Sequence, residues 1–144
     1  MRSLTLAALG LLLAAPLSAA DPNIEPGEWE VTSRVTTTGF MPMPEQSTTE
    51  TQCIRAEDVT ADALMALPVE DGCEITQRES GRDRATLAWR CDMNQGGMRM
   101  QADGRADMRF NGDRSDGTMD MKMTTPMGDM DIRGVITGRR IGDC

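Results

Sequence analysis

The sequence predicts an all-β protein: an antiparallel meander of seven to eight strands, strongly curved or closed into a small barrel, with one short helix and two disulfides. Three observations predict this fold. Apolar and polar residues alternate with period two along much of the chain. Glycine-containing pairs separate the alternating stretches, as they do in hairpins. Four cysteines occur in a chain of 144 residues that begins like an exported protein.

The first 20 residues have the features of a signal peptide that is removed on export. Arg2 is basic, Leu4 to Ala15 is an uncharged apolar run, and Ser18 to Ala20 supplies small residues before the expected cleavage site. About 12 apolar residues are too few to span a bilayer, and no cysteine near the cleavage site is available for lipidation. We expect residues 21–144 to form a single disulfide-stapled β domain that is soluble, periplasmic and without a transmembrane segment.

The first half of this domain contains four expected strands and the helix. Trp29 to Thr36 alternates as a half-buried strand does, and Thr48 to Ile54 is a second, Thr-rich strand. The residues from Ala56 to Leu67 suit a helix that ends before Pro68 and Gly72. Two further strands, Cys73 to Arg78 and Arg84 to Cys91, flank a turn at Ser80-Gly81.

The second half repeats one pattern, in which apolar residues alternate with charged ones. We expect the charged residues to face outward and to pair across strands, and Asn111-Gly112, Asp103-Gly104 and Asp116-Gly117 to form turns. The apolar members, which should face inward, are Met108, Phe110, Met119, Met121, Met123, Ile132 and Ile136.

Methionine must build much of the core. In residues 21–144, Leu, Ile, Val and Phe together number only 16, whereas Met alone numbers 12. So few large aliphatic residues in a charged chain would otherwise indicate disorder. Met is apolar and flexible enough to fill a core, and its regular alternation with charged residues places it on one face.

The four cysteines allow three pairings. If the turn at Ser80-Gly81 makes a hairpin, Cys73 lies opposite Cys91, where a cross-strand disulfide is geometrically reasonable. Cys53 then pairs with Cys144, the last residue. No Cys-x-x-Cys occurs, so we interpret both pairs as structural.

The composition excludes several classes of function. The chain has no His, which excludes His-based triads and His-liganded zinc. After residues 1–20 are removed, 14 basic and 23 acidic residues remain, a net charge of −9, which argues against binding to nucleic acid. No Gly-x-Ser-x-Gly and no phosphate-binding loop is present. We therefore expect a protein that is not an enzyme and carries no cofactor.

A set of short motifs runs through the domain and carries a resemblance to a known family. The motifs are Pro26-Gly27-Glu28-Trp29-Glu30-Val31, Met41-Pro42-Met43-Pro44, Cys53-Ile54 with Glu57-Asp58, the Cys73 to Cys91 hairpin, Gly112-Asp113 with Gly117-Thr118-Met119, and the closing Gly138-Arg139-Arg140-Ile141-Gly142-Asp143-Cys144. Together they resemble the bacterial exported family called domain of unknown function 3617. The resemblance covers Pro26 to Cys144 and implies an envelope protein without an assigned activity.

A weaker analogy links the chain to lipocalin-like barrels, whose first strand also begins with Gly-x-Trp, here Gly27-Glu28-Trp29. In such barrels an Arg near the end of the last strand packs over that Trp, a role that Arg139 or Arg140 would take here by a cation–π contact.

Three functions compete. The leading hypothesis is a binding module whose concave face holds an apolar or amphipathic ligand, or a partner protein of the envelope, with Trp29, Met108, Met119, Met121 and Met123 lining it. The second is a metallochaperone-like Cu(I)-binding protein that uses the soft thioethers of Met41 and Met43. The third is a structural envelope protein without a ligand.

Overall fold

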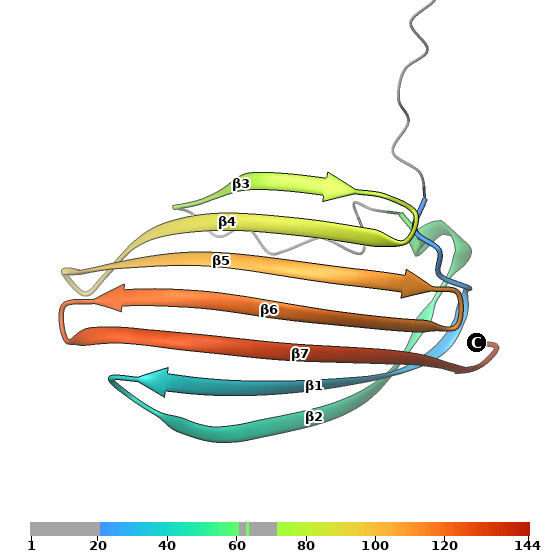
Figure 1. The fold of residues 1–144 in the computed structure, drawn as a ribbon, viewed down its shortest axis with the longest axis horizontal. Coiled ribbons are helices and arrows are strands. Elements are labelled where there is room, and N and C mark those ends of the chain that lie inside the picture. The colour runs from blue at the N-terminus through green and yellow to red at the C-terminus, as the bar shows by residue number, and fades with distance from the viewer. Residues whose placement is uncertain (1–20, 61–62, 64–71) are drawn as a thin grey trace, which may run out of the picture.

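The computed structural model describes residues 21–60, 63 and 72–144, which form one curved antiparallel sheet (Figure 1). The predicted all-β fold is confirmed, with seven strands in this part of the chain. The strands are β1 (Gly27–Gly39), β2 (Met43–Ile54), β3 (Cys73–Ser80), β4 (Arg84–Gln95), β5 (Met98–Asn111), β6 (Arg114–Thr125) and β7 (Gly128–Gly142).

The strand order across the sheet is β2-β1-β7-β6-β5-β4-β3. Strands β3 to β7 form the predicted meander, and β1 then pairs with β7, so that the hairpin of β1 and β2 extends the sheet on the far side. The first and last strands of the domain are therefore neighbours, as they are in a meander that closes into a barrel.

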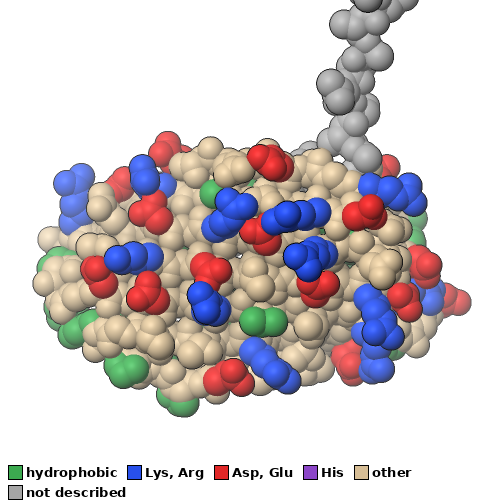
Figure 2. Space-filling model, in the orientation of Figure 1, with side chains coloured by type: hydrophobic (Ala, Val, Ile, Leu, Met, Phe, Trp, Pro, Cys, Tyr) green, Lys and Arg blue, Asp and Glu red, His purple; other side chains and the backbone are tan. Residues whose placement is uncertain are grey.

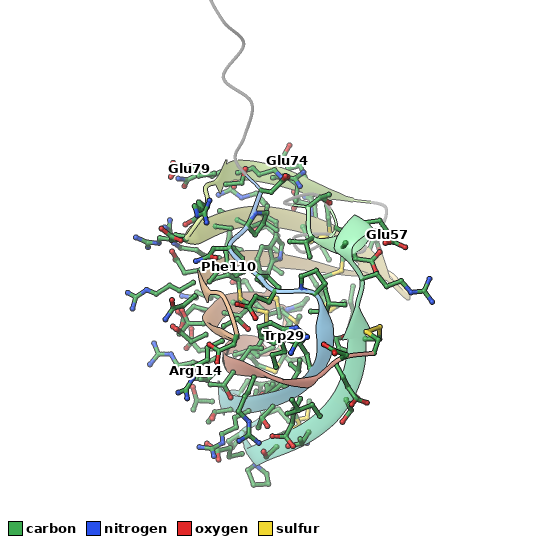
Figure 3. The ribbon with its side chains drawn as sticks, turned by 90° about the vertical axis from the view of Figure 1, so that its right-hand side faces the viewer. Trp29, Glu57, Glu74, Glu79, Phe110 and Arg114 are labelled. Carbon is green, nitrogen blue, oxygen red and sulfur yellow. A yellow bond between two sulfur atoms is a disulfide. The ribbon has the colours of Figure 1, made fainter. Side chains whose placement is uncertain are left out.

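The sheet of the described residues does not close, although it curves strongly (Figure 3). The strand count gives a physical reason. Every neighbouring pair is antiparallel, so with seven strands the two edges, β2 and β3, run in the same direction (Figure 1). Direct hydrogen bonding between β2 and β3 would therefore form a parallel pair, which is slightly less stable than an antiparallel pair. A short hairpin turn also cannot connect two parallel strands.

Half of the predicted helix from Ala56 to Leu67, namely residues 61–62 and 64–67, lies outside the described residues. The described part begins with one turn of 3₁₀ helix, Ala56–Asp58. The Asp58 carboxylate accepts a hydrogen bond from the Arg55 backbone N–H at 3.2 Å. That turn follows the end of β2 directly.

Two predicted turns are wrong. Asp103-Gly104 lies inside β5 and Asp116-Gly117 lies inside β6. Both glycines face the interior, where they make room for large side chains on the neighbouring strand. A Cβ on Gly104 would lie 2.2 Å from the Trp89 ring, and one on Gly117 would lie 2.1 Å from Met108 Sδ. Asn111-Gly112, in contrast, does form the turn between β5 and β6, and Gly112 has a φ of 64°.

Strand β2 is longer than predicted, because it begins at Met43 and includes Pro44. Proline is tolerated there because β2 is an edge strand, where a missing N–H need not break a ladder.

Both predicted disulfides are present, and each one fastens an edge strand to the rest of the sheet. Cys73 in β3 is bonded to Cys91 in β4, its direct cross-strand partner. Cys53 in β2 is bonded to Cys144, just beyond the end of β7. Their Cα–Cα distances are 3.9 and 5.6 Å.

The two faces of the sheet differ in chemistry, as the alternation predicts. The outer face carries charges of both signs along the strands (Figure 2), and several are paired across neighbouring strands. Arg133 Nε lies 2.7 Å from Asp120 Oδ1, and Arg90 Nε lies 2.7 Å from Asp103 Oδ1. The inner face carries the core, with Leu87, Trp89, Cys91 and Ala102 at its centre.

Asp107 links three side chains of the outer face. Its carboxylate accepts hydrogen bonds from Arg84 at 2.5 Å, from Arg105 at 2.9 Å and from the buried Thr86 hydroxyl at 2.9 Å. The hydrogen bonds from Arg84 and then Arg105 lower the pKa of Asp107 from 3.8 to about 2. The carboxylate form is therefore favoured by folding.

We expect Asp107→Asn to cost on the order of 1 kcal/mol at neutral pH. Because the pKa of Asp107 is lowered by folding, its stabilisation is complete above about pH 4 and is lost as the pH falls toward 2. Urea unfolding of both proteins at pH 6, 4, 3 and 2 should show their difference shrinking across that window. A difference that stays constant down to pH 2 would contradict this role.

Candidate functional site

One end of the inner face is closed by residues that pack around Trp29. We call it the tryptophan end, defined by Trp29, Phe110 and the lead-in residues 22–26. Trp29 is 1% exposed and its Nε1–H donates to the Glu25 carbonyl at 3.0 Å. Ile24 forms a β-bridge with Gly112, so the lead-in residues pair with the turn between β5 and β6. Figure 3 labels Trp29 and Phe110 at this end.

The two candidate arginines lie on opposite faces. Arg139 donates to Glu30 on the outer face at 2.9 Å. Arg140 is the cross-strand partner of Trp29, and its Nε–H donates to the Pro26 carbonyl at 2.8 Å. A Cβ on Gly27 would lie 2.5 Å from Arg140 Nε, so this glycine permits the close approach. Of the two arginines, Arg140 is therefore the one that could make the contact with the Trp29 ring that the lipocalin analogy predicts. The cation–π contact itself stays a prediction.

The four predicted lining methionines lie on the inner face and are half-buried. Met119, Met121 and Met123 follow one another along β6, and Met119 and Met121 pack against the central core. Met108 on β5 lies over Gly117. Trp29 differs from them, because its burial leaves almost no surface for a ligand. The methionines are the predicted residues that keep accessible surface on this face.

Sequence reasoning missed three further methionines of the inner face, Met93, Met100 and Met130. Met93 lies opposite Met100, and Met130 lies opposite Met123. All three are half-buried. The period-two pattern would have found them if it had been extended to the ends of β4, β5 and β7.

Between β4 and β1 the inner face is almost free of charge. The strand register relative to the inward-facing Trp29 and Trp89 identifies the other inward positions of β4, β5, β6, β7 and β1. One of these positions is charged, Arg140 at the tryptophan end. Charge returns on the two edge strands, where Glu50 of β2 lies opposite Val31 and Arg78 of β3 lies opposite Leu87.

Met121 tests whether the methionine face stabilises the fold. Met121→Leu should change the free energy of unfolding by less than about 1.5 kcal/mol, because volume and polarity are conserved. Met121→Asp should cost at least about 2 kcal/mol, because it places a charge on an apolar surface. Lys122→Ser, on the opposite face of the same strand, should stay within about 0.5 kcal/mol. Equal effects of Met121→Asp and Lys122→Ser in urea unfolding would contradict the assignment of faces.

The methionines of the Cu(I) hypothesis lie at the turn between β1 and β2. Met41 is 54% exposed and Met43 is 46% exposed. Among the residues that the structure describes, no group of three or more His, Cys, Asp or Glu side chains is arranged to hold a metal ion.

A hollow of about 830 Å³ lies on the outer face, away from most of the predicted site. Of the predicted lining residues, it contacts Met121 only. Several of its charged side chains are engaged with each other, Arg133 with Asp120 for instance. It is lined by Thr36, Thr38, Asp103, Gly104, Arg105, Asp120, Met121, Lys122, Asp131, Ile132 and Arg133.

Comparison with known proteins gives a family. The family model described as "Protein of unknown function (DUF3617)" matches residues 24–144. The chain belongs to the DUF3617 family. The match spans all seven strands and both disulfides of this DUF3617 protein. No curated protein and no solved structure matches it. Within the described residues, no helix is both long and apolar enough to cross a membrane.

Proposed function

We propose that this DUF3617 protein is an exported, non-enzymatic binding module that holds an apolar or amphipathic ligand against its methionine-rich inner face. One observation carries the proposal. The sheet is curved and open, and its inner face exposes part of Met108, Met119, Met121 and Met123 while remaining almost free of charge. Flexible thioether side chains adapt to apolar ligands of different shape.

The two disulfides support export to the periplasm. Structural disulfides persist in oxidising compartments and are rare in the cytosol. All four cysteines are bonded here, and residues 1–20 have the composition of a signal peptide.

The charge distribution favours an amphipathic ligand with a long apolar part. The uncharged strip from β4 to β1 suits an alkyl or acyl chain, because burying a polar group there without a partner would be costly. Glu50, on the inward side of the edge strand β2, suits a polar group at the edge of the strip. The absence of His excludes a histidine general base for turnover of such a ligand.

Quenching of Trp89 fluorescence by a fatty acid brominated along its chain tests the proposal. Trp89 lies opposite Gly104, which in turn lies opposite Met121. In the Trp29→Phe variant, Trp89 is the sole tryptophan. We expect saturable quenching by the brominated fatty acid and competition by the same fatty acid without bromine.

Two adjacent residues on opposite faces provide the matched pair of variants. Met123→Gln should weaken binding at least 10-fold, whereas Lys122→Gln should leave it unchanged. Absence of saturable quenching, or equal effects of both variants, would overturn the proposal.

Cu(I) binding is the second candidate, favoured by the exposure of Met41 and Met43. Titration with Cu(I) under reducing conditions tests it. The double variant Met41→Leu, Met43→Leu keeps the apolar character of the turn but removes both thioethers, so it should lose the bound metal if this candidate is right. Stoichiometric Cu(I) binding by the variant would exclude these two residues as the site.

A further inference from the structure

The hairpin turns at the two ends of the sheet have opposite chemistry. At the tryptophan end, the turns contain Gly81-Arg82-Asp83 and Gly112-Asp113, the polar residues that turns ordinarily use. At the other end, which we call the methionine end, three turns meet. They comprise residues 39–43 between β1 and β2, 95–98 between β4 and β5, and 125–128 between β6 and β7.

The methionine end exposes large apolar side chains at all three turns. Phe40, Met41, Met43, Met98 and Met127 are between 46% and 59% exposed. Residues 39–43, 95–98 and 125–128 include no charged residue, in a chain with 38 charged residues. Turns with apolar tips are costly for solubility, and apolar surface gathered at one end of a molecule marks an interaction site.

We propose that the methionine end docks onto the surface of an electrically neutral phospholipid bilayer. This inference concerns a second surface and does not require the ligand binding proposed above. The apolar tips of the three turns belong to neighbouring hairpins, about 10 Å apart for every two strands, and Phe40 of the β1–β2 turn lies against Gly128 of the β6–β7 turn. They form one row of apolar side chains along this end of the sheet. A fluid bilayer accepts such a row whatever its detailed shape, whereas a protein partner needs a matching complementary surface.

The charges of the molecule determine which bilayer fits. The tips have no Lys or Arg with which to attract anionic lipid. The net charge of the whole chain is −8, which repels an anionic surface. Uncharged tips on an acidic protein therefore suit a zwitterionic membrane, held by apolar contact instead of by ion pairing.

The methionine end is also continuous with the inner face. Met93, Met100, Met123 and Met130 lie directly behind the three turns, on the inward side of β4 to β7. A bilayer docked at this end would adjoin the apolar strip without an intervening charged residue from these strands. The opposite end offers no such route, because Trp29 and Phe110 are buried there.

Flotation with phospholipid vesicles tests the inference. The purified protein, with both disulfides formed, is mixed with phosphatidylcholine vesicles and separated on a density gradient. We expect it to float with these vesicles, to stay bound in 0.5 M NaCl, and to bind less when phosphatidylglycerol is included at low salt. Failure to float with neutral vesicles, or binding that needs anionic lipid and is released by salt, would overturn the proposal.

Variants of the tips separate docking from other roles. The triple variant Met41→Gln, Met98→Gln, Met127→Gln changes exposed side chains, so it should melt as the wild type does and lose at least 10-fold in vesicle binding. The matched control Ile75→Gln, Ile141→Gln changes apolar residues of similar exposure outside the tips and should bind as the wild type does. Equal binding by the two variants would overturn the proposal.

Two further measurements distinguish alternative occupants of the tips. Light scattering that shows a dimer for the wild type and a monomer for the triple variant, with no flotation, would assign the tips to a second copy of this chain and overturn lipid docking. The triple variant combined with Trp29→Phe should still show Trp89 quenching by the brominated fatty acid, whereas Met123→Gln should still float. Failure of ligand binding and failure of docking are thereby told apart.

Discussion

Trp29→Ala is expected to lower the free energy of unfolding by about 3–5 kcal/mol. Trp29 is almost completely buried, its ring lies over Gly138, and its indole N–H is bonded to the Glu25 carbonyl. Removing the ring leaves a cavity at the tryptophan end that the rigid strand ends β1 and β7 do not fill. Chemical denaturation followed by circular dichroism measures the loss.

Trp29→Phe is the control for this prediction. It keeps most of the apolar volume but removes the hydrogen bond to Glu25, so it should cost clearly less than Trp29→Ala. A loss below about 1 kcal/mol for Trp29→Ala would mean that the tryptophan end is not packed, and the distinction between the two ends would fail.

Removal of the Cys53–Cys144 disulfide is expected to have the second large effect. Cys53→Ala with Cys144→Ala should cost about 2–5 kcal/mol, since the bond closes a loop with a sequence separation of 91. The bond joins the edge strand β2 to the carboxyl end of the chain, beside the end of β7 that carries Arg140, the cross-strand partner of Trp29.

The other disulfide supplies the comparison. Cys73→Ala with Cys91→Ala opens a loop with a separation of only 18 residues, for which chain entropy predicts about 3 kcal/mol. The double variant of Cys53 and Cys144 should therefore unfold at a lower urea concentration than that of Cys73 and Cys91. The reverse order would show that loop entropy does not govern these two bonds.

The sequence predicts most of this fold because its alternation is strong. Met119, Met121 and Met123 alternate with Asp120 and Lys122, and a period of two fixes which side chains share a face. The same periodicity, combined with the turn at Ser80-Gly81, placed Cys73 opposite Cys91. The register at the turn, with Arg78 opposite Leu87, would place Cys73 opposite Asp92. A shift of one residue between Ile75 and Gln77 brings Cys73 opposite Cys91.

Other features depend on contacts that are distant in the sequence. The glycines at positions 104 and 117 follow Asp, as turn glycines do, yet they serve Trp89 and Met108 on a neighbouring strand. The pairing of β1 with β7 joins residues that are 91 to 114 positions apart. Neither local propensity nor periodicity reports such partners, and the open edge between β2 and β3 follows only when the whole strand order is known.

For the same reasons, the sequence predicts only part of the candidate site. Alternation identifies Met108, Met119, Met121 and Met123 as inward, but it does not say that Trp29 is packed shut while Met93, Met100 and Met130 extend the face toward the opposite end. The contrast between the two ends arises only when three hairpin turns are brought together in space.

Native mass spectrometry of the protein extracted under mild conditions from the cells that produce it tests the central claim most directly. We predict a mass above that of the chain with two disulfides, with the excess removed by organic solvent and identified as an amphipathic molecule with a long apolar chain. The mass of the protein alone, or an excess that corresponds to copper, would contradict a binding module with an apolar ligand on its methionine face.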